Sequence, residues 1–295
     1  MPAAAVGGSA RCRRAVVVGD PQQLEPVVTL PDALVVELLR HHRAQGELAP
    51  NRASVQTLAD SVSRTGTDHL GRWIGLPLVV HNRCLDPMFS IANEVAYAGE
   101  MIFGRPGSGG DHPWGPSRWI DVPRPDGAHF HGVDAEHVAA LLRELDWSLP
   151  HDDARGRSVA IISPFKEVVR ALDRRVRAEV PKLLSPDLRR DEQEVQKALE
   201  AVSVGTVHTF QGREKTAVVL VLGGGSPGAR SWAASTPNLL NVAVARAKDR
   251  LVVIGDRHSG GESVTCARWT RTCRPDRRVC KAKGPCFEHL SGLTG

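Results

Sequence analysis

Short apolar runs alternate with amphipathic segments along most of the chain. The apolar runs predict buried strands at residues 15–18, 76–84, 158–163, 202–207, 217–222 and 251–254, with a further short strand at 119–121. Apolar residues at helical spacing predict helices over residues 31–44, 86–97, 166–180 and 237 to about 249, and two more that begin at Ser54 and Asp134. This alternation is typical of an α/β fold with a mainly parallel sheet.

Polar clusters follow the predicted strands. They are Gly19-Asp20, His81–Arg83, Ser163-Pro164, His208–Glu214 and Gly255-Asp256. In a parallel sheet the ligand crevice lies outside the carboxyl ends of the strands. We therefore expect these clusters to share one edge of the sheet. Together with Arg246, which the helical pattern places on the helix before the last strand, they predict a site for a charged ligand.

Composition and net charge exclude few classes of protein. The chain of 295 residues is long enough for one large or two modest domains, and its 41% hydrophobic and 24% charged residues are ordinary for a globular protein. The net charge of +5 permits nucleic-acid binding, but fits a slightly basic cytosolic protein equally well. No apolar run could span a membrane and no signal peptide is recognisable. We expect a cytoplasmic protein with reduced cysteines and no membrane partner.

Four segments carry a specific resemblance. They are GDPQQLEP at 19–26, LVVHNRC at 78–84, VGTVHTFQGRE at 204–214 and NVAVARAKDRLVVIGD at 241–256. In this order they resemble motifs III, IV, V and VI of superfamily 1 helicases, in the subgroup that contains the RNA-surveillance helicase. The resemblance spans roughly residues 15–256. It implies a RecA-like lobe, of the fold found in P-loop NTPases, that closes on ATP held by a preceding lobe.

The resemblance also implies a role for each matching residue. Arg83 and Arg246 would be arginine fingers, and Gln23 would couple the γ-phosphate to movement between lobes. The implied nucleotide-binding residues are Asp20, Gln211, Gly212 and Glu214, and the implied nucleic-acid contacts are Thr206 and His208. The implied cofactors are ATP and Mg²⁺, and the implied partners are single-stranded DNA or RNA and a chain that carries the first lobe. The alternatives are solvated arginines at 83 and 246 and a histidine at 208 that only satisfies local hydrogen bonds.

Two departures from the family limit this reading. The family binds ATP with a phosphate loop that ends in Gly-Lys-Ser or Gly-Lys-Thr, which occurs nowhere in the sequence. The Asp-Glu pair that holds Mg²⁺ in the family does not precede residues 19–26. The chain therefore resembles a helicase that is entered just after motif II.

We expect three regions. Residues 1–53 would be the remainder of a first RecA-like lobe, 54–258 the second lobe, and 259–295 a basic, poorly ordered tail. The cysteines of this tail, at positions 266, 273, 280 and 286, are too widely spaced for a typical zinc site, and we expect no metal. Its arginines and lysines could touch nucleic-acid phosphates, and a shifted reading frame is an alternative origin for its sequence.

Three functions remain open at this point. The first is half of an ATP-dependent DNA or RNA helicase, not a competent ATPase alone but active when another chain supplies the missing motifs. The second is a remnant lobe that binds nucleic acid or a partner without hydrolysis. The third is a truncated gene product that still folds in part.

Overall fold

The structure is a computed structural model. It describes residues 7–8, 10–24, 30–44, 46, 49, 53–69, 71–105, 107, 112–147, 158–257 and 274–275. The chain divides into two compact units. The first comprises Met1–Val80 with Glu100–Ile102, and the second His81–Gly99 with Phe103–Gly295. Each unit is described separately below.

A parallel sheet forms the centre of the second unit. Its strands are β5 (Arg118–Asp121), β6 (Val159–Ser163), β7 (Val202–Thr206), β8 (Lys215–Val221), β9 (Ala247–Gly255) and β10 (Arg274–Pro275). They lie in the order β10-β5-β9-β8-β6-β7, and every neighbouring pair is parallel. The predicted α/β fold with a mainly parallel sheet is confirmed, and the apolar runs at 158–163, 202–207, 217–222 and 251–254 all contain a strand.

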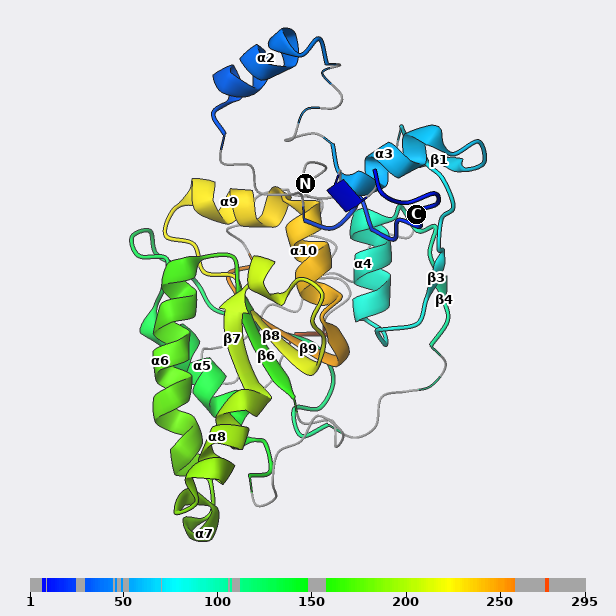
Figure 1. Ribbon diagram of the computed structural model, residues 1–295. Coiled ribbons are helices and arrows are strands. Elements are labelled where there is room, and N and C mark those ends of the chain that lie inside the picture. The colour runs from blue at the N-terminus through cyan, green and yellow to red at the C-terminus, as the bar shows by residue number, and fades with distance from the viewer. Residues whose placement is uncertain are drawn as a thin grey trace, which may run out of the picture. The chain divides into compact units, whose positions relative to one another are not determined.

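Helices cover both faces of this sheet (Figure 1). The helices of the second unit are α4 (Met88–Ala96), α5 (Gly132–Arg143), α6 (Lys166–Leu183), α7 (Pro186–Arg189), α8 (Glu192–Ala201), α9 (Pro227–Ser235) and α10 (Pro237–Val244), of which α7 lies beyond the end of the sheet. Alternate strand residues such as Ile161 and Val219 join the core with α5 and α6. Their neighbours Ile162 and Leu220 are also fully buried. Because both faces are buried, the strands read as continuous apolar runs.

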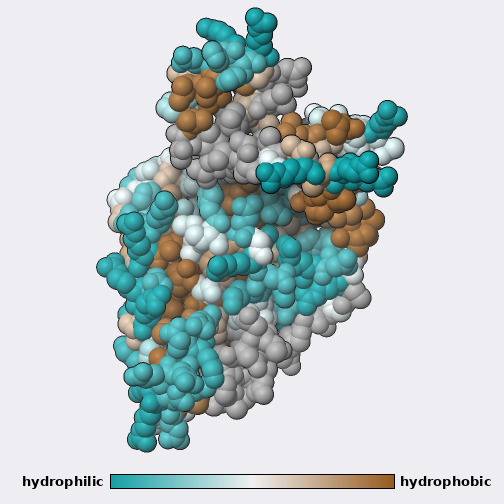
Figure 2. Space-filling model, in the orientation of Figure 1, coloured by the Kyte–Doolittle hydropathy of each residue, from teal (hydrophilic) through white to brown (hydrophobic). Residues whose placement is uncertain are grey.

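The charged segment 181–200 is largely helical. Ser185 and Asp191 cap α7 and α8 with their side-chain oxygens, and within α8 only Ala198 and Ala201 are buried. Figure 2 shows hydrophilic side chains over this end of the unit. This segment is therefore mostly solvated, and α8 contributes one small apolar face to the core.

The helix predicted over 237–249 is shorter than expected. It ends at Val244, and β9 begins at Ala247, which pairs with Lys215 of β8. Arg246 therefore lies in the turn between α10 and β9 and not on a helix. The start of another helix also differs from the prediction: the N-cap of α5 is His131, and Asp134 lies inside its first turn. The helix α9, which begins at Pro227 after its cap Ser226, was not predicted.

The first unit holds small elements. They are α2 (Asp32–His41), α3 (Val55–Val62) and the antiparallel pair β1 (Thr67–His69) and β2 (Arg72–Ile74). The predicted N-cap at Ser54 is confirmed, because its side chain accepts from Thr57 N. The predicted strand at 15–18 is wrong. Within the described residues it pairs with no other strand, and Val16 and Val18 are 91% and 80% exposed.

A further two-stranded sheet joins β3 (Val80–His81) to β4 (Ile102–Phe103), so only part of the strand predicted at 76–84 forms. The proposed boundaries at 53/54 and 258/259 stay predictions. Apart from β10, the predicted tail lies outside the described residues, as do its four cysteines.

Gly205 offers a test of the packing at the end of β7. Here the 3₁₀ turn η3 (His208–Phe210) folds back on the strand, and a Cβ at 205 would overlap Thr209 Oγ1 and lie 2.9 Å from Phe210 Cε2. We expect Gly205→Ala to lower the free energy of unfolding by about 1–3 kcal/mol. The measurement is guanidinium unfolding followed by circular dichroism. Gly132→Ala is the control, since a Cβ there meets nothing within 4 Å, and equal stability of the two variants would refute the argument.

Candidate functional site

The predicted polar clusters divide between the two edges of the sheet. Thr206 ends β7 at the carboxyl edge, whereas Glu214 directly precedes β8 and Arg246 directly precedes β9, at the amino edge. The expectation that all clusters share the carboxyl edge is therefore wrong. The reason is that β7 and β8 are parallel to β6 between them, so residues 207–214 must return along the sheet before β8 can start.

Arg246 is buried, with 1% of its surface exposed. Its Nε donates to Val242 O at 3.1 Å and its Nη1 donates to Arg213 O at 3.0 Å. Its Nη2 is buried and has no hydrogen-bond partner within the described part of the chain. Burial, and next the charge of Arg83, lower the pKa of Arg246 below its ordinary value. A fixed guanidinium with an unused donor is suited to accept an anion, because a buried donor without a partner is costly.

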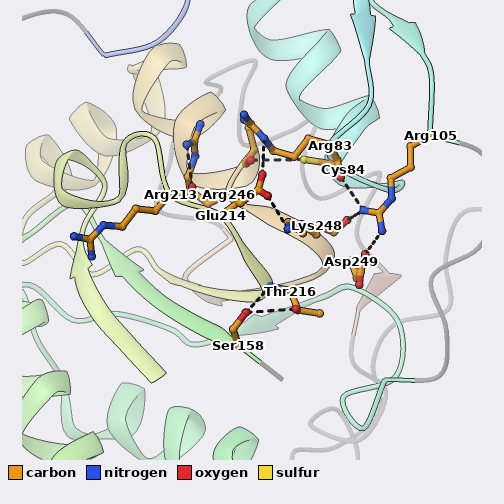
Figure 3. Close-up of polar contacts among 11 residues, drawn as sticks. Arg83, Cys84, Arg105, Ser158, Arg213, Glu214, Thr216, Arg246, Lys248 and Asp249 are labelled. Atoms are coloured by element: carbon orange, nitrogen blue, oxygen red, sulfur yellow. Dashed lines mark hydrogen bonds and ion pairs between the residues drawn. The ribbon is translucent and has the colours of Figure 1, made fainter. Parts of the chain in front are cut away.

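Glu214 lies between two cations (Figure 3). Its Oε1 is 2.6 Å from Lys248 Nζ and its Oε2 is 3.1 Å from Arg83 Nε. The hydrogen bond from Lys248 and the charges of Lys248 and Arg83 lower the pKa of the Glu214 carboxyl. The carboxylate thus holds two cationic side chains beside the turn that carries Arg246.

Arg105 fixes the backbone of this cluster. Its Nη1 donates to Arg83 O at 2.7 Å and to Lys248 O at 3.0 Å, and its Nη2 lies 2.7 Å from Asp249 Oδ1. Leu85 N also donates to Lys248 O, at 2.8 Å. These bonds tie the segment that follows β3 to the start of β9. They explain how Arg83, far from Arg246 in the sequence, lies next to it.

Cys84 is a structural residue of the same cluster. It is fully buried, and its thiol lies 3.7 Å from Ala245 O, to which it donates. Burial raises the pKa of the Cys84 thiol to about 12. The thiol is therefore neutral and contributes packing between the Arg83 segment and the turn before β9.

The cluster as a whole is cationic. Among the described residues, the side chains of Arg83, Arg105, Arg246 and Lys248 face two carboxylates, Glu214 and Asp249, and both carboxylates are already paired. Among the described residues no group of histidine, cysteine, aspartate or glutamate is arranged to hold a metal ion. The arrangement can therefore bind an anion.

The remaining predicted residues lie elsewhere. Gln211 and Gly212 form the exposed turn before Arg213, and Gly212 has the positive φ of +81° that this turn requires. Asp20 and Gln23 belong to the first unit, where Gln23 Nε2 donates to Asp20 Oδ2 at 3.2 Å. The roles assigned to these four residues stay predictions. His208 is exposed, and its role as a nucleic-acid contact also stays a prediction.

Arg105, Lys248 and Asp249 were not predicted. Lys248 follows Arg246 by two residues. A correct prediction that β9 begins at Ala247 would have placed both side chains at the start of that strand. Arg105 comes from a segment rich in glycine and proline, and its contacts are all long-range. No local pattern in the sequence indicates it.

Comparison with known proteins finds one matching family and a set of similar solved structures. Residues 117–258 match the model of a family described as AAA domain. One similar solved structure is the C-terminal domain of a possible DNA helicase from Lactobacillus plantarum WCFS1. It is 15% identical to this chain with a TM-score of 0.36, and the match covers 63% of this chain and 92% of the chain in that structure. No curated protein matches the chain.

The matched AAA domain is one found in the C-terminal regions of superfamily 1 helicases. The predicted resemblance is therefore confirmed over residues 117–258, which match this domain, and the predicted α/β fold of RecA-like type is confirmed with it. In the described part of the chain, no helix is both long and apolar enough to cross a bilayer.

The pH dependence of stability tests the Glu214 bridge. Because the pKa of Glu214 is lowered from 4.5, its ion pairs stabilise the folded state above that value, and this contribution is lost as pH falls through the lower, folded-state pKa. Glu214 is 41% exposed, so solvent screening limits the effect to about 1 kcal/mol. We expect wild type to exceed Glu214→Gln in free energy of unfolding at pH 7 and this difference to shrink below pH 4.5. A difference that is constant with pH would contradict the assignment.

Thiol labelling tests the burial of Cys84. We expect iodoacetamide at neutral pH to label the exposed Cys12 and to leave Cys84 unlabelled until the protein is unfolded. Peptide mass spectrometry, with and without guanidinium, measures both sites in one sample. Equal labelling of the two cysteines in the native protein would show that the cluster around Arg83 opens readily.

Proposed function

We propose that the second unit acts as the second lobe of an ATP-dependent superfamily 1 nucleic-acid helicase. In this role it supplies Arg83 and Arg246 to a nucleotide that a separate first lobe holds. The observation that supports this most directly is the unused Nη2 donor of the buried Arg246. A guanidinium that is held by two backbone carbonyls has little freedom left, so it is preorganised to meet a phosphate oxygen.

Arg83 and Glu214 fit the same role. Arg83 is 39% exposed, and its pair with Glu214, which Lys248 also holds, keeps its head group beside the turn that carries Arg246. ATP, when bound, would supply the phosphoryl group that leaves, and its hydrolysis needs charge neutralised at the γ-phosphate. In this proposal the chain itself contributes the neutralisation of charge at the γ-phosphate, through Arg83 and Arg246. Because both carboxylates of the cluster are paired, we assign Mg²⁺ to acidic ligands of the first lobe.

Nucleic acid belongs to the other edge of the unit in this proposal. Thr206 and His208 lie at the carboxyl end of β7, away from the arginine cluster at the start of β8 and β9. Single-stranded DNA or RNA would pass there, and we propose a cytoplasmic location for the protein. The proposal requires a first lobe that carries the phosphate loop, since these 295 residues contain no such loop.

The test is nucleic-acid-stimulated ATPase activity in trans. The full chain is combined with a polypeptide that carries the phosphate loop and the Asp-Glu pair of a superfamily 1 first lobe. We expect no appreciable turnover by the full chain alone and turnover by the mixture. Arg246→Ala should lower kcat of the mixture by about 10³-fold or more, as for other arginine fingers.

Arg177→Ala is the matched control, because Arg177 is an exposed arginine on α6 that pairs only with Asp173 in the described structure. It should leave kcat unchanged. Turnover that survives Arg246→Ala would refute the arginine-finger role. Turnover by the isolated chain that depends on Arg246 would refute the need for a first lobe.

A further inference from the structure

One arginine joins the segment around Arg83 to the start of β9. Arg105 Nη1 donates to Arg83 O at 2.7 Å and to Lys248 O at 3.0 Å, and Arg105 Nη2 lies 2.7 Å from Asp249 Oδ1. The guanidinium therefore has acceptors in both segments at once (Figure 3). Arginine suits this position because its planar fork presents several donors in a fixed geometry, which a lysine does not.

The pairing of β3 with β4 brings Arg105 to this place. Gly104 N, directly after β4, donates at 3.0 Å to His81 O, in the last residue of β3. Arg105 follows Gly104 directly, and Arg83 follows His81 by two residues. Strand pairing therefore places Arg105 beside Arg83, although the two residues are far apart in the sequence.

The two proposed arginine fingers are held in different ways. Arg246 is fixed through its own guanidinium, which donates to two backbone carbonyls. The side chain of Arg83 is 39% exposed, and within the described part of the chain its guanidinium pairs with Glu214 alone. A long, exposed side chain with one ion pair keeps much of its rotamer freedom. The position of the Arg83 guanidinium therefore depends on how firmly its backbone is held.

The backbone around Arg83 is held on both sides of Cys84. Arg83 O accepts from Arg105, and Leu85 N donates to Lys248 O at 2.8 Å. Loss of the Arg105 guanidinium would remove the bond on the Arg83 side and leave the one at Leu85. Arg105 does not itself face a nucleotide, because two carbonyls occupy its Nη1 and the carboxylate at 249 holds its Nη2.

We propose that Arg105, held by Asp249, is a positioning residue for ATP hydrolysis: it fixes the Arg83 backbone so that the Arg83 guanidinium reaches the γ-phosphate. The inference rests on the proposed function and extends its site by two residues. A catalytic group that is misplaced by about 1 Å can lower a rate by about 100-fold. Arg105 should affect kcat much more than KM for ATP, because Arg83 neutralises charge that develops in the transition state.

The experiment is the trans ATPase assay with a double-mutant cycle between positions 105 and 83. Arg105→Ala should lower kcat of the mixture by about 100-fold and change KM for ATP little. In the Arg83→Ala background the same change should lower kcat no further, because no guanidinium is left to position. Arg105→Lys should restore only part of kcat. Asp249→Asn, which keeps an acceptor oxygen, should lower kcat less than Arg105→Ala.

Arg189→Ala is the matched control. Arg189 Nη2 also donates to two backbone carbonyls, Lys182 O at 2.6 Å and Leu184 O at 3.0 Å, but it belongs to α7. Its removal should leave kcat unchanged. An equal kcat for Arg105→Ala and Arg189→Ala would overturn the proposal. So would an equal loss of kcat with and without Arg83, or a loss that appears only in KM.

Failure of this inference differs from failure of the proposed function. A kcat that falls with Arg83→Ala but not with Arg105→Ala would refute the positioning role alone. A kcat that neither Arg83→Ala nor Arg246→Ala changes would refute the proposed function.

A second measurement needs no ATPase activity. Cys84 lies between the two backbone bonds that hold this segment, so its labelling by iodoacetamide reports how often the segment opens. Arg105→Ala should raise the labelling rate of Cys84 in the native protein by about tenfold or more, because bonds from a charged donor are lost. Arg189→Ala should leave the rate unchanged, and circular dichroism confirms that each variant is folded. An unchanged rate in Arg105→Ala would overturn the proposal, whatever the ATPase assay shows.

Discussion

Burial of the Arg246 guanidinium is the constraint on which the candidate site depends. An arginine that is 1% exposed is stable only where nearby acceptors offset its lost hydration. The acceptors here are Val242 O, in the last turn of α10, and Arg213 O, just before β8. Both positions follow from the parallel pairing of β8 and β9, in which Lys215 N donates to Arg246 O. The apolar strands therefore set the place of the cationic turn, and Arg83 reaches it through the contacts of Arg105 with Lys248 and Asp249.

Residues 206–214 join the two edges of the sheet within a single short connection. They begin at the carboxyl end of β7 and end at Glu214, beside Arg83. Arg213 lies near the end of this connection, and its backbone carbonyl accepts from Arg246. A movement of Arg213 would change the support of Arg246 directly. The fold thus places the carboxyl end of β7 and a backbone support of Arg246 within one short connection.

The parts of this fold that sequence patterns could predict are those where burial controls the pattern. The strands β6 and β8 are apolar over residues 159–162 and 217–221 because both sheet faces are covered, and they were predicted within a few residues. The end of α10 was not predicted, because residues 245–249 are compatible with a helix and only pairing with β8 makes residues 247–249 part of a strand. The strand at 15–18 failed for the opposite reason: its apolar residues need a neighbouring strand, which no described segment supplies. The motif residues Arg83, Glu214 and Arg246 do lie together. Their partner Arg105 could not be predicted, because its contacts are with residues far away in the sequence.

The central claim is that Arg83 and Arg246 face the γ-phosphate of a nucleotide held by another lobe. The most direct measurement is a structure of the full chain with a first-lobe polypeptide, ADP, Mg²⁺ and aluminium fluoride, which imitates the transferred phosphoryl group. The account predicts that Arg246 Nη2 and the Arg83 guanidinium lie within hydrogen-bond distance of the fluoride, while Arg246 keeps its bonds to Val242 O and Arg213 O. A complex in which the fluoride contacts neither arginine, and the Arg83–Glu214 pair faces solvent, would contradict it.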